Sequence, residues 1–188
     1  HGVTMAAASM TALAYAQDGF GLPLDFVKHT TAPDYYNEAQ IDESEEDFAN
    51  RCALELEELI LAEGPDTVAA LFAEPVMGAG GVIIPPAGYF EKIRSVLEKY
   101  DVLLVADEVI CGFGRTGNMW GSQTMDVRPD ILTCAKALSS AYLPISAVMI
   151  SDKIYAPLAE QAEKLGIFGH GYTYSCLLYT SPSPRDQS

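Results

Sequence analysis

Four short apolar segments, separated by turns and polar stretches, constrain the fold of this chain more than any other feature of its sequence. Each is four to seven residues long, which suits a buried strand better than a helix. Amphipathic patterns over 89–100 and 154–164 predict helices after the first and the last of them. Buried strands with helices between some of them are typical of an α/β sheet with covered faces. The predicted strands are 67–73, 102–106, 131–134 and 147–151.

The composition excludes several classes of protein. Among 188 residues, 26 are acidic and 11 basic, giving a formal net charge of −15. A negative net charge argues against nucleic acid as a partner, because the phosphate backbone binds basic surfaces. Hydrophobic residues make up 49% of the chain, which argues against disorder. No apolar run approaches the ~18 residues of a membrane-spanning helix, so we expect neither a nucleic-acid nor a membrane partner.

Most of the negative charge lies in residues 34–63, which hold eleven acids and one base, Arg51. Within this segment Ser44 and Asp47 resemble a capping box, and Gly64 followed by proline is a stop signal. Apolar residues recur at helical spacing between the two signals. We therefore predict a surface helix over 45–63 with an acidic outer face, so the net charge says little about function.

The cysteines and the alanine-rich start of the chain bear on its compartment. The cysteines lie far apart, without the close spacing of a zinc site or a disulfide framework. Residues 3–16 lack the basic leader of a signal peptide and predict a packed helix of small side chains. Reduced thiols and no export signal predict a cytoplasmic protein. The four cysteines are Cys52, Cys111, Cys134 and Cys176.

Charged side chains follow three of the predicted strands. Glu74, Asp107 and Lys136 each come just after the carboxyl end of an apolar segment. Ligands of open α/β sheets bind outside those ends. Any one of these residues alone is typical of a surface loop, but three at equivalent ends predict a polar cluster over an apolar floor.

Two nucleotide-binding patterns compete for this cluster. The strand ending in Asp107 and Glu108 resembles the magnesium-binding strand of P-loop ATPases, but the phosphate-binding string GxxxxGK[ST] does not occur in the chain. Residues 112–117 match the dinucleotide-binding pattern GxGxxG letter for letter. That pattern needs its first glycine directly after a strand and a helix at its end, and residues 118–121 are a poor helix start. A nicotinamide site is disfavoured, and an ATPase or a non-catalytic interaction protein remains an alternative.

A longer pattern accounts for more residues. It combines LLVADEVICGFGRTG, a twelve-residue spacer to Asp130, and DILTCAKALSSA, and it extends outward through EPVMGAGGVIIPPAGYF and FGHGYTYS. This pattern resembles the signature of class III aminotransferases, the pyridoxal-phosphate enzymes of fold type I, and most of all the omega-amino-acid:pyruvate transaminases. The resemblance covers essentially 1–175. It implies that the α/β fold is a fragment of the large cofactor-binding domain, a mostly parallel sheet flanked by helices.

The resemblance implies roles for individual residues. Lys136 matches the lysine that forms a Schiff base with the cofactor aldehyde, and burial beside other cations would keep its amine nucleophilic. Asp107 matches the carboxylate that pairs with the pyridine nitrogen and keeps the ring an electron sink. Val109 matches the aliphatic side chain against one ring face, and Glu74 matches a supporting acid near the cofactor. His1 matches a neighbour of a cofactor-stacking aromatic residue rather than a catalytic group.

Further residues and partners are implied by the same resemblance. Thr173 matches a threonine that reaches the cofactor phosphate of the neighbouring subunit, with Tyr172 beside it, which implies a homodimer with shared active sites. The implied reaction transfers an amino group from an amine or amino-acid donor to a keto acid such as pyruvate, with pyridoxal 5′-phosphate as cofactor and no metal. An aminomutase or a decarboxylase on the same scaffold is the alternative, because it shares Lys136 and Asp107.

Both ends of the chain suggest a piece of a longer enzyme. The chain begins with His1 inside a helical pattern, and the resemblance stops where the composition changes, after Ser175. We expect 1–175 to be part of the large domain and 176–188 to be a non-native tail. Because the upstream phosphate-binding and downstream substrate-binding segments are not in the sequence, we expect the fragment alone to be inactive.

Overall fold

The computed structural model describes residues 1–169 and residue 171. The chain divides into two compact units, His1–Ile150 and Ser151–Ser188. Among the described residues the second unit contains one helix, α6 (Asp152–Leu165), close to the bounds predicted for it. The remaining helices and strands of the described residues belong to the first unit. No helix in the described part of the chain is long and apolar enough to cross a membrane.

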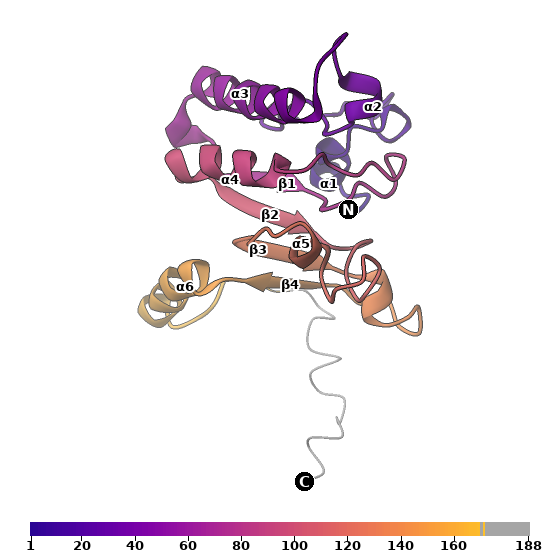
Figure 1. The fold of residues 1–188 in the computed structure, drawn as a ribbon. Helices are drawn as coiled ribbons and strands as arrows, with labels where there is room; N and C mark the ends of the chain where they lie inside the picture. Colours follow the sequence, from indigo (N-terminus) through magenta and orange to yellow (C-terminus); the bar gives the residue numbers. More distant parts are fainter. Residues whose placement is uncertain (170, 172–188) are drawn as a thin grey trace. The chain divides into compact units, whose positions relative to one another are not determined.

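The first unit is built on a four-stranded sheet whose spatial order follows the chain (Figure 1). The strands are β1 (Ala70–Ala73), β2 (Leu103–Asp107), β3 (Ile131–Cys134) and β4 (Ala147–Ile150). The first three are parallel, and β4 runs antiparallel to β3. The predicted α/β architecture with a mostly parallel sheet is therefore confirmed.

Two long helices, one packed on β2 and the other packed on the first, supply most of the core. Helix α4 (Tyr89–Lys99) packs against β2, and α3 (Glu45–Glu63) packs against α4 (Figure 1). Full burial of a large apolar side chain contributes about 1.5–3 kcal/mol, so this layer is a main source of stability. The largest fully buried apolar side chains of the cluster are Phe48, Ile60, Ile93, Leu97, Leu104 and Cys52.

Helix α3 has the bounds that the sequence predicts. The Ser44 hydroxyl accepts a hydrogen bond from the Asp47 amide at 3.1 Å and donates one to the Asp47 carboxylate at 2.6 Å. Three acids lie in the first turn, where their negative charges interact favourably with the helix dipole and stabilise the helix. The helix ends at Gly64, whose φ of 92° is open to glycine but rarely to other residues.

Two predicted elements are shorter than expected. The helix predicted over 3–16 is limited to α1 (Met5–Met10) and a 3-10 turn, η1 (Ala14–Ala16). The side-chain amide of Gln17 donates hydrogen bonds to the backbone carbonyls of Ala8, Ser9 and Thr11. It takes the place of the backbone N–H donors that a longer helix would supply, and α1 ends there. The strand predicted over 67–73 begins only at Ala70, because η2 (Pro65–Thr67) precedes it and the Thr67 hydroxyl donates to carbonyls at the end of α3.

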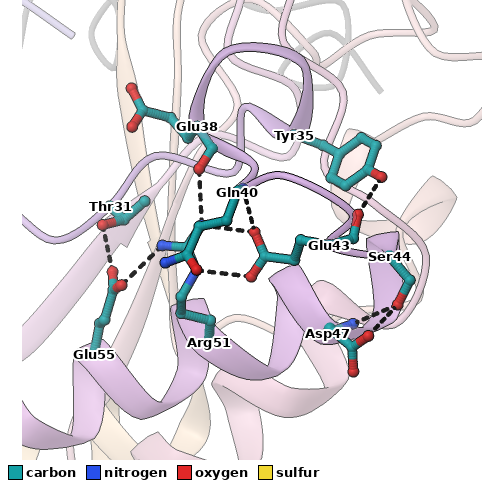
Figure 2. A network of polar contacts seen from close by, with 9 residues as sticks. All are labelled: Thr31, Tyr35, Glu38, Gln40, Glu43, Ser44, Asp47, Arg51 and Glu55. Carbon is teal, nitrogen blue, oxygen red and sulfur yellow. Dashed lines mark hydrogen bonds and ion pairs between the residues drawn. The ribbon is translucent and has the colours of Figure 1, made fainter.

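The single base of the acidic segment is the centre of a polar network (Figure 2). Arg51 donates to both carboxylate oxygens of Glu43, at 2.8 and 3.0 Å, and to Glu55 at 2.8 Å. It also donates to the Glu38 carbonyl at the end of α2 (Tyr35–Glu38), and its guanidinium lies 5.1 Å from the centre of the Phe48 ring. The network therefore ties residues 38–43 to helix α3.

We expect Arg51→Met to lower the free energy of unfolding by about 1–2 kcal/mol. Methionine keeps an apolar side chain near Phe48 but removes the hydrogen bonds that Arg51 donates to Glu43, Glu55 and the Glu38 carbonyl, which solvent partly screens. Urea unfolding of the two proteins measures the difference. Arg128→Met is the control, because Arg128 is exposed and has no ion pair among the described residues; an equal loss in both variants would contradict the role of the network.

The stabilisation by this network depends on pH. The Arg51 hydrogen bond lowers the pKa of Glu43 below its usual 4.5, and hydrogen bonds from Thr31 and then Arg51 lower the pKa of Glu55. Lowered folded-state pKa values stabilise the fold above the unfolded-state pKa, and the contribution is lost as the pH falls through the folded-state values. The difference between wild type and Arg51→Met should therefore shrink below pH 4.5, and a constant difference would contradict it.

Candidate functional site

Parallel pairing brings the three charged residues predicted as a cluster to one edge of the sheet. Strand β1 runs beside β2 with Ala73 opposite Ala106, and Asp107 lies opposite Thr133 of β3. Glu74 therefore begins the loop next to the end of β2, and Lys136 follows the end of β3 by two residues. The predicted juxtaposition at the carboxyl ends of the strands is present in the fold.

Asp107 is nearly buried and its two carboxylate oxygens have different partners. The residue is 8% exposed. Its Oδ1 accepts a hydrogen bond from the Val109 amide at 3.1 Å, which fixes the direction of the carboxylate. Its Oδ2 contacts the amino group of His1 and lies 3.3 Å from Nδ1 of the same residue. One oxygen is thus held by the local backbone, while the other meets nitrogen groups from a distant part of the chain.

Lys136 has an unusual backbone conformation and an exposed side chain. It opens the 3-10 turn η3 (Lys136–Leu138) with a φ of 44°, in the left-handed region. A non-glycine residue there is uncommon, and such conformations cluster at functional sites. The expected burial of Lys136 is wrong for the described residues, in which its side chain is exposed.

Glu74 is half-buried, and the charges of Asp107 and Lys136 influence its pKa. Its Oε2 accepts a hydrogen bond from the Gly78 amide at 3.0 Å, so it holds the start of the glycine-rich loop. Burial raises the pKa of Glu74 above its usual 4.5, the charge of Asp107 raises it further, and Lys136 lowers it. The charges of Asp107 and Lys136 thus act in opposite directions on the Glu74 carboxyl.

A buried acid beside Asp107 was not predicted as a site residue. Glu108 is 0% exposed, and its carboxylate accepts hydrogen bonds from the Gly121 amide at 2.8 Å and the Ser122 amide at 2.7 Å. These amides open the short helix α5 (Gly121–Thr124). No spacing rule links residue 108 to 121, and the signal available in the sequence is a second acid at the end of an apolar strand.

The glycine-rich segment after β2 does not form a dinucleotide-binding turn. Residues 112–120 are turns and bends, and α5 begins only at Gly121. The rejection of a nicotinamide site at residues 112–117 is therefore consistent with the fold.

No group of three or more metal-binding side chains occurs within residues 1–169. A hollow of about 590 Å³ lies between α2 and residues 80–87 and contains none of the predicted site residues.

We expect Gly121→Ala to destabilise the protein by about 1–3 kcal/mol through overpacking. A Cβ at this position would lie 2.6 Å from the Cys111 Cβ, 2.9 Å from the Pro75 Cβ and 3.1 Å from the Glu108 carboxylate. Gly80→Ala is the matched control, because its Cβ would meet nothing closer than 3.7 Å. Thermal unfolding compares the variants, and equal melting temperatures would contradict the tight packing around Gly121.

The structure describes some of the remaining predicted residues and not others. Val109 is buried, and its amide bonds to Asp107 as described. Thr173 and Tyr172 lie outside the described residues, so their proposed contact with a neighbouring subunit stays a prediction. His1 was expected to be the chain neighbour of a cofactor-stacking aromatic residue rather than a catalytic group, and its imidazole Nδ1 lies 3.3 Å from Asp107 Oδ2.

Comparison with known proteins agrees with this arrangement. The family model of aminotransferase class-III matches residues 1–176, which include every strand of the sheet and the whole cluster at its edge. The chain belongs to the class III aminotransferases. The resemblance of the sequence to this family is thereby confirmed.

Three similar proteins, two curated and one of known structure, are named as transaminases. Gamma aminobutyrate transaminase 1, mitochondrial, of Solanum lycopersicum is 54% identical over 175 residues, covering 93% of this chain and 34% of that protein. Diaminobutyrate–2-oxoglutarate transaminase of Halomonas elongata is 50% identical over 177 residues, covering 93% and 38%. The omega transaminase of Pseudomonas jessenii in complex with PMP has a TM-score of 0.90 and 55% identity, covering 93% of this chain and 38% of its own. The chain thus spans about a third of the length of its curated relatives.

Class III aminotransferases depend on pyridoxal 5′-phosphate, and the residues at the sheet edge fit this cofactor. Asp107 Oδ2 lies 3.3 Å from the imidazole Nδ1 of His1, and a carboxylate oxygen with a nitrogen neighbour of this kind can accept a hydrogen bond from a ring N–H. Lys136 presents an exposed amine near the same edge. An acceptor for a nitrogen and a primary amine are the two groups that the cofactor chemistry requires.

Proposed function

We propose that the complete protein containing this chain is a pyridoxal-phosphate-dependent transaminase. It would move an amino group from an amine or amino-acid donor to a keto acid such as pyruvate. The observation that carries the proposal is the placement of Asp107 at the carboxyl end of β2 and of Lys136 two residues beyond the carboxyl end of the adjacent parallel strand β3. The transaminase names of the relatives support it, and they favour transamination over an aminomutase, a decarboxylase or an ATPase.

Each residue at the carboxyl ends of the strands would have its own chemical role. Pyridoxal phosphate, when bound, supplies an aldehyde that amines attack and a ring that accepts the electron pair left by a departing proton. Asp107 would keep a proton on the ring nitrogen through its Oδ2, with Oδ1 fixed by the Val109 amide. Lys136 Nζ would hold the cofactor through its aldehyde and, once released, carry a proton from the substrate carbon to the cofactor carbon that bore the aldehyde. Val109 would offer an apolar surface, and Glu74 would hold the glycine-rich loop through Gly78.

The assembly and location of the complete protein are further parts of the proposal. A homodimer with shared active sites follows from the family resemblance through Thr173. A cytoplasmic location is suggested by buried free thiols, which are found at Cys52, Cys111 and Cys134. The plant relatives carry the names mitochondrial and chloroplastic, so the location is best tested on the complete protein in its own cell. The division into a native 1–175 and a non-native 176–188 likewise remains a prediction.

The test of the proposed function uses the complete protein, purified and supplied with pyridoxal phosphate. Incubation with pyruvate and either gamma-aminobutyrate or a simple primary amine should produce alanine in amounts equal to the donor consumed. A protein that binds the cofactor and yields carbon dioxide or a rearranged amine without alanine would favour the decarboxylase or the aminomutase. Binding of ATP and magnesium without binding of pyridoxal phosphate would reject the proposal.

A further inference from the structure

We propose that Glu108 is a positioning residue that holds Asp107 in its cofactor-facing orientation from the interior of the fold. The inference rests on the function proposed above and extends it to a residue that does not face the cofactor. Glu108 is fully buried, and its carboxylate bonds to two consecutive backbone amides, those of Gly121 and Ser122. Charged hydrogen bonds of this kind are about twice as strong as neutral ones, so Glu108 is a rigid link between β2 and α5.

The backbone of Glu108 is held as firmly as its side chain. Its amide donates to the Thr133 carbonyl at 2.9 Å, which extends the pairing between β2 and β3 one residue beyond Asp107. Its carbonyl accepts from the Gly112 amide at 2.8 Å. Successive residues of an extended chain point to opposite faces, so a fixed Glu108 side chain also fixes the direction of Asp107.

The surroundings leave little space for Glu108 to move. A Cβ at Gly112 would lie 2.8 Å from the Glu108 carbonyl oxygen and 2.9 Å from the ring of Trp120. A Cβ at Gly121 would lie 3.1 Å from the Glu108 carboxylate. Because the strand end and the following loop are in such close contact, a change in the carboxylate is transmitted to residues 107–109.

Replacing Glu108 with glutamine tests this link with little change in shape. The carboxamide oxygen can accept from one of the two amides, but its NH2 group then faces the other N–H, which is left buried without an acceptor. The strand end must shift to relieve that contact. Displacement of a binding group by about 1 Å can cost about 100-fold, so we expect E108Q to weaken cofactor binding about 10- to 100-fold.

Asp130 provides the matched control at the other end of β2. It is buried like Glu108, at 8% exposure, and its Oδ2 accepts from the Leu104 amide at 2.9 Å and from Arg94 at 3.1 Å. Its replacement, D130N, should destabilise the same strand without disturbing Asp107. A general loss of stability would affect both variants alike, whereas loss of positioning affects only the variant at Glu108.

The experiment titrates pyridoxal phosphate into the cofactor-free complete protein and follows the visible absorbance and the melting temperature. Both variants should melt lower than wild type, but only E108Q should bind the cofactor more weakly and change the shape of its absorbance band. If E108Q does not fold, E108D, which keeps the charge on a shorter side chain, takes its place with the same expectation. Cofactor binding that is equal to wild type, or equally weakened in D130N, overturns the role of Glu108. A wild-type protein that binds no pyridoxal phosphate overturns the proposed function as well.

Discussion

Replacing Lys136 with alanine in the complete enzyme is expected to lower the rate of transamination by at least about 10⁴-fold. In the proposed mechanism this one amine both attaches the cofactor and moves the proton at the substrate carbon. The visible absorbance band of the attached cofactor should disappear with the activity. Stopped-flow and steady-state assays with pyruvate as acceptor measure the rate, and an absorbance spectrum of the purified protein measures the attachment.

Two control variants separate this role from a general effect of charge. Lys136→Arg keeps a cation at the left-handed position after β3, but its guanidinium stays protonated and cannot attach the cofactor, so it should be as inactive as alanine. Lys164→Ala removes an exposed lysine of α6 that pairs with Glu160, and it should leave the rate unchanged. Retention of the visible band in Lys136→Ala would show that another residue attaches the cofactor.

Replacing Asp107 with asparagine is expected to lower the rate about 100- to 1,000-fold. Asparagine keeps the size of the side chain and an oxygen acceptor, but it removes the negative charge that would hold a proton on the ring nitrogen. The fold should survive, because the local bond from the Val109 amide needs only an oxygen. The rate constant for loss of the substrate proton, followed with a deuterated donor, measures the effect.

Asp126→Asn is the matched control for Asp107. Asp126 is exposed and has a φ of 50°, a conformation that asparagine also adopts readily. Its replacement should change neither the rate nor the melting temperature. Equal rates in the Asp107 and Asp126 variants would mean that the charge at the end of β2 has no part in the chemistry.

The sequence predicts the sheet and its polar edge because both depend on local patterns. Apolar segments followed by Glu74, Asp107 and Lys136 place these residues correctly once the strands are taken as parallel. Helix α3 is predicted to the residue, because its cap and its stop signal lie within the helix and its immediate neighbours.

What the sequence does not predict depends on contacts between distant or irregular segments. The Gln17 side chain ends α1 from seven residues beyond its last residue, a distance at which no helix signal operates. Glu108 finds its partners 13 and 14 residues away in an irregular loop. The left-handed backbone of Lys136 follows from the turn after β3 rather than from the preference of lysine.

The most direct measurement of the central claim is to locate the cofactor on the protein. Borohydride reduction of the cofactor-loaded complete enzyme, followed by proteolysis and mass spectrometry, should find the added mass on one lysine, Lys136. If the added mass is found on another lysine, such as Lys99 or Lys153, or on no residue at all, the result contradicts the assignment of Asp107 and Lys136 to the catalytic site.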